Sequence, residues 1–177
     1  MCIRDRYVTY RRVIEGMKGK PVTFRTLDVG GDKVLSYYHH AREQNPGMGM
    51  RSIRFSLQNK DIFAEQIKAI LRAGPDADVR IMFPMISSIE EFLEARQVVA
   101  ICIKDLGQSG VEHNDSPKIG MMVELPSVLN LIDAFAEEAV LFENCFASIP
   151  LTLRTRPSKA SSPTTRVSLR LSLWTTP

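Results

Sequence analysis

The sequence lacks long apolar runs, and its cysteines are few and scattered. No apolar stretch approaches the roughly 20 residues that a membrane-spanning helix needs, and no apolar signal region opens the chain, which predicts a cytoplasmic protein without a membrane partner. The three cysteines, Cys2, Cys102 and Cys145, have neither the spacing of a metal site nor the even number of a disulfide framework. Cys102 lies in an apolar helical stretch, which predicts a buried thiol.

Acidic residues and glycine are absent from residues 150–177. This segment holds five Ser, six Thr and four Pro, a composition that buries too little apolar surface to offset the entropy of ordering. We therefore expect a disordered tail. The tail carries five cations, so residues 1–149 have a net charge of −2 although the whole chain has +3. Nucleic-acid binding through the tail would need interleaved aromatic residues, and the tail offers only Trp174, so we expect no nucleic-acid partner.

Residues 7–149 have the pattern of an α/β domain. The chain has 177 residues, of which 44% are hydrophobic, enough for one globular core. Apolar runs predict strands at 22–27, 79–83 and 118–123, with a fourth run at 140–149. Helices are predicted at 7–18, at 61–73, from a Ser87 or Ser88 cap to about 106, and from a Ser127 cap to about 139. This alternation predicts parallel strands joined by helices.

The first predicted strand carries a cation, Arg25, inside its apolar run and ends at Asp28 and a Gly30-Gly31 pair. A buried arginine is costly unless it meets an anion, and its planar fork matches carboxylate and phosphate groups. Glycines at the turn permit close approach of the backbone to a ligand. The segment therefore indicates an anionic substrate; the alternative is a structural Arg–Asp pair beside a glycine turn.

Two further features suit the carboxyl ends of parallel strands, where ligands bind in α/β folds. Arg51 and Arg54 are three residues apart and would share one helix face, with Arg51 near a helix start that favours anions. The alternative is a solvated basic turn. Glu124 ends the third predicted strand. Together, Arg25 and Glu124 predict a site with a guanidinium for an anion and a carboxylate for a metal.

Four segments in this order resemble blocks of one family, the phosphoenolpyruvate-binding barrel of phosphoenolpyruvate–protein phosphotransferase. This is enzyme I of the bacterial sugar phosphotransferase system, together with its nitrogen-related paralogues. The resemblance covers residues 7–149 and rests on the segments Arg25-Thr26-Leu27-Asp28-Val29-Gly30-Gly31-Asp32-Lys33, Asn45-Pro46 with Gly49-Met50-Arg51-Ser52-Ile53-Arg54, Arg80-Ile81-Met82-Phe83-Pro84-Met85 and Ile119-Gly120-Met121-Met122-Val123-Glu124-Leu125-Pro126.

The resemblance implies a partial TIM (β/α)8 barrel that binds phosphoenolpyruvate and Mg²⁺. In the family the phosphoryl group passes to a histidine on a separate N-terminal domain and then to a small phosphocarrier protein, and members dimerise through the barrel. By motif, Arg25 and Arg51 would hold the phosphate of phosphoenolpyruvate, and Glu124 would be a magnesium ligand. These roles agree with the interpretation of the residues themselves, because Mg²⁺ prefers carboxylate and phosphate oxygens.

The sequence also departs from the family. Gln44 stands where the family usually has Glu before Asn-Pro. After Ile149 the family continues with a Gly-Thr-Asn-Asp-Leu block that supplies a second metal ligand and a substrate contact, whereas this chain has Pro150 and the Ser/Thr/Arg tail. We expect residues 150–177 to reflect a lost reading frame or a truncated gene, and residues 1–6 to be unassigned or foreign.

These departures predict a chain that is inactive by itself. The phosphohistidine domain and the second metal ligand are both expected to be missing. Two alternatives remain open at this point: a fragment of pyruvate phosphate dikinase or phosphoenolpyruvate synthase, which share the barrel, and a non-catalytic interaction module.

Overall fold

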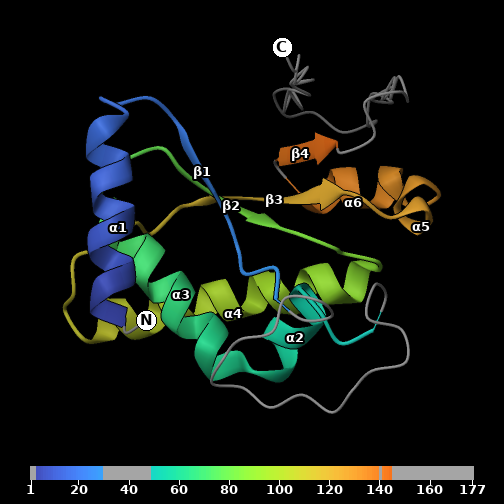
Figure 1. Ribbon diagram of the computed structural model, residues 1–177, viewed down its shortest axis with the longest axis horizontal. Helices are drawn as coiled ribbons and strands as arrows, with labels where there is room; N and C mark the ends of the chain where they lie inside the picture. Colours follow the sequence, from blue (N-terminus) through green and yellow to red (C-terminus); the bar gives the residue numbers. More distant parts are fainter. Residues whose placement is uncertain (1–2, 30–48, 140, 145–177) are drawn as a thin grey trace, which may run out of the picture.

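The strands form one parallel sheet. The computed structural model describes residues 3–29, 49–139 and 141–144 (Figure 1). Within them lies a four-stranded sheet in the order β1-β2-β3-β4, and each neighbouring pair is parallel. The strands are β1 (Val22–Arg25), β2 (Val79–Phe83), β3 (Lys118–Val123) and β4 (Leu141–Asn144). The predicted α/β class is confirmed, and the boundaries of the second and third strands are correct at both ends.

One helix, α1, precedes the first strand, and the other helices connect successive strands. They are α1 (Ile3–Gly16), α2 (Ile53–Gln58), α3 (Lys60–Ala73), α4 (Ile89–Gln108), α5 (Pro126–Leu129) and α6 (Ile132–Glu138). In Figure 1 the helices α2, α3 and α4 lie on the same side of the sheet, and α1 stands beside α3. Among the described residues, no helix combines the length and the apolar character that crossing a membrane requires.

A row of phenylalanines joins the sheet to these helices. Phe83 of β2 contacts Phe63 of α3 edge to face with ring centroids 6.0 Å apart, and Phe92 of α4 with centroids 5.9 Å apart. Phe92 continues the row to Phe135 of α6 at 6.2 Å. All four side chains are fully buried. Through this row α3 and α4 pack on one face of β2.

Arg25 is not buried, contrary to the expectation from the sequence. Successive side chains of a strand point to opposite faces. In β1, Val22 and Phe24 point into the core, so Thr23 and Arg25 point to the opposite face and are exposed. The guanidinium therefore carries no burial cost that would demand an anion.

Several predicted helix ends are also wrong. The first helix begins at Ile3, so it includes part of the segment that the sequence left unassigned. The predicted helix over 127–139 is two helices, α5 and α6, and its N-cap is Leu125 rather than Ser127, because Pro126 takes the first helical position. The cap of α4 is Ser88, whose Oγ accepts a hydrogen bond from the Glu91 N–H.

The predicted tail over 150–177, the Gly30-Gly31 turn and Gln44 lie outside the described residues.

Candidate functional site

The candidate site is the edge of the sheet where β1, β2 and β3 end. The chain leaves β1 through residues 26–29, leaves β2 through residues 84–88, and leaves β3 at Glu124. The start of α2 approaches the same edge, because the Ser52 N–H donates to the Val29 carbonyl at 2.7 Å. We call this set of segments the carboxyl edge. It is the edge at which parallel α/β sheets bind ligands.

Arg51 lies at this edge, immediately before the Ser52 N-cap of α2. It does not share a helix face with Arg54, because α2 begins only at Ile53. Its Nη2 donates to Asp28, 3.1 Å from Oδ1 and 3.4 Å from Oδ2. Both side chains are mostly buried, with 19% of Arg51 and 15% of Asp28 exposed. The Arg–Asp pair that the sequence left open as an alternative is therefore present, but it is made by Arg51.

The Arg51 guanidinium keeps donors beyond this ion pair. Its Nε is buried and has no hydrogen-bond partner among the described residues. A guanidinium carries five N–H donors in a rigid fork, which suits a second acceptor such as a phosphate oxygen. Arg51 is thus held in place by Asp28, and its Nε–H has no acceptor among the described residues.

Arg25 is the last residue of β1 and lies on the sheet face opposite the helices. Its Nη1 lies 4.0 Å from the Met122 Sδ of β3. Because β2 separates β1 from β3, the side chain extends across β2. Its convergence with Arg51 on one anion stays a prediction.

Glu124 follows β3 directly and is half-buried. Its Oε2 accepts a hydrogen bond of 2.9 Å from the Met85 N–H, in the segment that follows β2. Met85 has φ 56°, a left-handed conformation that is unfavourable for a residue with a side chain. The carboxylate is thus oriented by a strained backbone donor of the neighbouring strand end. Among the described residues, no group of three or more His, Cys, Asp or Glu could hold a metal ion.

Sequence reasoning missed the role of Glu91 at this edge. The pattern indicated only a Ser87 or Ser88 cap here, whereas the Glu91 carboxylate accepts hydrogen bonds from the Ser87 N–H and Oγ at 2.7 Å each, and from the Arg54 Nε at 3.2 Å. Arg54 also donates to the Gly49 carbonyl at 3.2 Å. Arg54 lies 37 residues from Glu91 in the sequence, so no local spacing could reveal this pair. The Arg54–Glu91 pair ties α2 to the first turn of α4.

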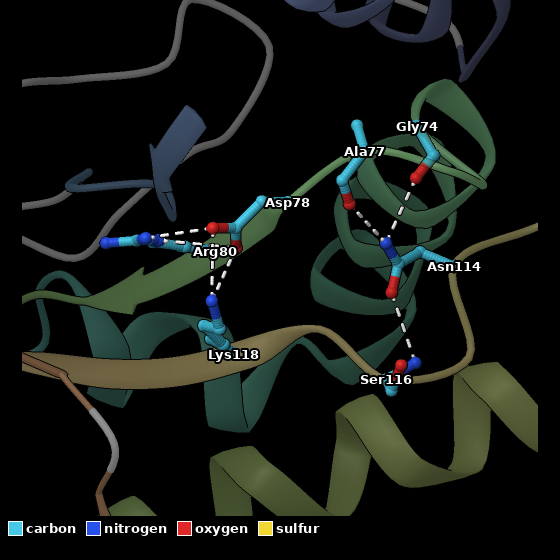
Figure 2. A network of polar contacts seen from close by, with 7 residues as sticks. All are labelled: Gly74, Ala77, Asp78, Arg80, Asn114, Ser116 and Lys118. Atoms are coloured by element: carbon cyan, nitrogen blue, oxygen red, sulfur yellow. Dashed lines mark hydrogen bonds and ion pairs between the residues drawn. The ribbon is translucent and has the colours of Figure 1, made fainter. Parts of the chain in front are cut away.

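A second polar network lies at the opposite, amino edge of the sheet (Figure 2). Asp78 accepts from the Arg80 Nη2 at 2.9 Å and from the Lys118 Nζ at 3.0 Å. The hydrogen bond from Arg80, followed by that from Lys118, lowers the pKa of Asp78. Both cations there are bound to the same carboxylate, so this network ties β2 to β3 rather than forming a second anion site.

The fold and the site together define a class of protein: a parallel α/β domain with arginines and a carboxylate at the ends of its strands. Residues 2–144 match the family described as PEP-utilising enzyme, PEP-binding domain, and the chain belongs to this family. The match includes residues 2–6, which the sequence pattern left unassigned.

Curated relatives agree with this family. The chain is 46% identical over 138 residues to the phosphoenolpyruvate-protein phosphotransferase of Mycoplasma capricolum subsp. capricolum. It is 42% identical over 138 residues to the protein of the same name from Priestia megaterium, and 41% identical over 138 residues to that from Bacillus subtilis. Each alignment covers 78% of this chain and 24% of the relative. The chain thus spans about a quarter of the length of these relatives.

Proposed function

We propose that this chain is the phosphoenolpyruvate-binding part of a phosphotransferase, which moves the phosphoryl group to a protein histidine and on to a phosphocarrier protein. The observation that carries the proposal is Arg51, which is fixed by Asp28 at the carboxyl edge while its Nε remains without a partner among the described residues. The family and the names of the relatives support the phosphotransferase over the pyruvate phosphate dikinase alternative.

Arg51 and Arg25 would hold the phosphate of phosphoenolpyruvate. Arg51 reaches the edge from the start of α2, and Arg25 reaches it from the end of β1. Two guanidinium groups beside one phosphate would neutralise its charge, which is the main contribution that proteins make to phosphoryl transfer. Asp28 would keep Arg51 in the required orientation.

Glu124 offers one carboxylate of the kind that magnesium binds. Mg²⁺ binds one or two carboxylates together with substrate phosphate oxygens, and it would supply charge neutralisation at the phosphate. Glu124 would hold the ion, oriented by the Met85 N–H. Because the described residues offer no larger cluster of ligands, we expect Mg²⁺ to bind this chain tightly only together with phosphoenolpyruvate.

We further propose that the four parallel strands are an arc of a (β/α)8 barrel, which needs eight strands to close. The partners expected for the whole protein are a phosphocarrier protein and a second copy that contacts the barrel, in the cytoplasm. An arc leaves apolar surface open, so the isolated chain is expected to bind a hydrophobic dye and to associate. A monomer that unfolds cooperatively and binds no dye would count against the arc.

The binding test uses the full 177-residue chain and calorimetric titration with phosphoenolpyruvate and Mg²⁺. Hydrogen bonds to charged groups contribute about 1.5–3 kcal/mol, so Arg51→Ala should weaken binding roughly 10- to 100-fold. Lys104→Ala removes an exposed cation of α4 and serves as the matched control, with unchanged affinity. Equal affinity of the wild-type and Arg51→Ala proteins would refute the proposal.

Turnover requires a separate test. We expect no release of pyruvate when the chain is incubated with phosphoenolpyruvate, Mg²⁺, a phosphocarrier protein and a separately supplied phosphohistidine domain. Glu124 is the single proposed metal anchor, and misplacement of the ion by about 1 Å can cost roughly a hundredfold in rate. Pyruvate released above the level of an Arg25→Ala control would overturn this expectation.

A further inference from the structure

A polar side chain, Gln66, lies in the apolar face of α3. Only 3% of the residue is exposed, and its helix neighbours Phe63, Ile67 and Ile70 are fully buried in the core. Burial of an amide is costly unless its hydrogen bonds are made. The partners of this amide therefore show what it does in the fold.

Both ends of the Gln66 amide are bound. Its Oε1 accepts a hydrogen bond of 3.0 Å from the Leu27 N–H, two residues beyond the end of β1. Its Nε2 donates to the Tyr10 hydroxyl of α1 at 3.0 Å. The Tyr10 ring in turn packs edge to face on Phe24 of β1, with centroids 4.8 Å apart. Gln66 thus connects α1 to the chain just after β1.

The Leu27 N–H cannot be satisfied by the sheet. The preceding N–H, that of Thr26, donates to the Met82 carbonyl of β2 at 3.0 Å. Successive N–H groups of an extended chain point to opposite sides, so the Leu27 N–H points away from β2. Gln66 supplies the acceptor that no strand provides on that side among the described residues.

We propose that Gln66 is a positioning residue for the anion site at the carboxyl edge. By holding the Leu27 N–H it fixes the segment between Arg25 and Asp28. Asp28 in turn fixes the Arg51 guanidinium at 3.1 Å. The amide therefore sets the placement of both arginines without contacting the ligand. This inference rests on the proposed function, because the ligand it serves is the phosphate of phosphoenolpyruvate.

Two substitutions separate positioning from packing. Gln66→Leu keeps a similar volume but leaves the Leu27 N–H without its acceptor, and we expect a roughly tenfold weaker affinity for phosphoenolpyruvate. Gln66→Glu keeps an acceptor oxygen for Leu27, and burial favours the neutral acid, whose O–H can donate to the Tyr10 hydroxyl as the amide does. The Glu variant should therefore bind within about threefold of the wild-type protein.

The controls lie on the same helix. Ile70→Val removes one buried methylene, so it lowers the melting temperature without touching Leu27, and its affinity should be unchanged. Glu65→Gln changes an exposed neighbour and should change neither quantity. The readouts are calorimetric affinity for phosphoenolpyruvate with Mg²⁺, the melting temperature, and the hydrogen-exchange rate of the Leu27 amide.

The outcomes are distinct. The inference predicts faster exchange at Leu27 and weaker binding in Gln66→Leu, with both restored in Gln66→Glu. Wild-type affinity in a folded Gln66→Leu, or a loss in Ile70→Val as large as that in Gln66→Leu, would overturn it while the proposed function stands. If the wild-type chain binds no phosphoenolpyruvate, the proposed function fails, and this inference fails with it. Unchanged exchange at Leu27 would overturn the inference whatever the binding result.

Discussion

Replacement of Asn114 by alanine should destabilise the domain more than most single substitutions. Asn114 lies between α4 and β3 and is 6% exposed. Its Nδ2 donates to the carbonyls of Gly74 at 3.1 Å and Ala77 at 2.9 Å, and its Oδ1 accepts from the Ser116 N–H at 3.1 Å (Figure 2). The side chain thus joins the segments that precede β2 and β3.

The expected magnitude follows from these three bonds. A neutral hydrogen bond contributes about 1 kcal/mol net, and its loss inside a protein leaves buried groups unpaired, so Asn114→Ala should lower the free energy of unfolding by about 3 kcal/mol. Urea denaturation, monitored by the helical circular dichroism signal, measures this difference. As a control, Ser116→Ala removes an exposed hydroxyl and keeps the Ser116 N–H, so its effect should be within about 0.5 kcal/mol. A loss below about 1 kcal/mol for Asn114→Ala would show that these three hydrogen bonds contribute little to stability.

Three further predictions concern single residues. The hydrogen bond from Arg80 lowers the pKa of Asp78, so the Asp78 carboxylate stabilises the fold above the ordinary carboxyl pKa, and this stability is lost as the pH falls through the lowered pKa. The melting temperature of Asp78→Asn should therefore fall less steeply with decreasing pH than that of the wild-type protein, and an equal fall would contradict this. Burial raises the pKa of the Cys102 thiol to about 11. An alkylating reagent near neutral pH should therefore modify Cys102 slowly in the folded chain and rapidly in urea, and equal rates would show that the thiol is accessible in the folded chain. A Cβ on Gly74 would lie 2.8 Å from the Ile14 Cδ1, so Gly74→Ala should cost about 1–3 kcal/mol in urea denaturation, and a neutral effect would show that α1 adapts freely.

The sequence predicted best the strand and the helix that end at a proline or a glycine. The strand over 79–83 is a run of apolar residues closed by Pro84, and the structure has the same bounds. The helix over 61–73 ends at Gly74-Pro75 and extends by one residue at its start. In contrast, the prediction ran through the break between α5 and α6, although Asn130, the C-cap of α5, is of a residue type that commonly ends helices.

The sequence predicted single residues of the site but not the contacts between them. Motif and position identified Arg25, Arg51 and Glu124 as candidates, and the structure places each of them at or directly beside the carboxyl edge. The exposure of Arg25 was missed although Val22-Thr23-Phe24-Arg25 alternates apolar and polar residues, which is the pattern of a half-buried strand. The Gln66–Leu27 contact spans 39 residues, so it exists only once β1 and α3 are packed together. Contacts of this kind depend on tertiary structure and leave no local signal.

An NMR titration locates the binding site of phosphoenolpyruvate on this chain. Amide shifts of the ¹⁵N-labelled chain are recorded as phosphoenolpyruvate and Mg²⁺ are added. We expect the largest changes at the carboxyl edge, at the amides of Asp28, Ser52 and Met85. Changes concentrated instead at the amino edge, around Asp78 and Lys118, would contradict this expectation.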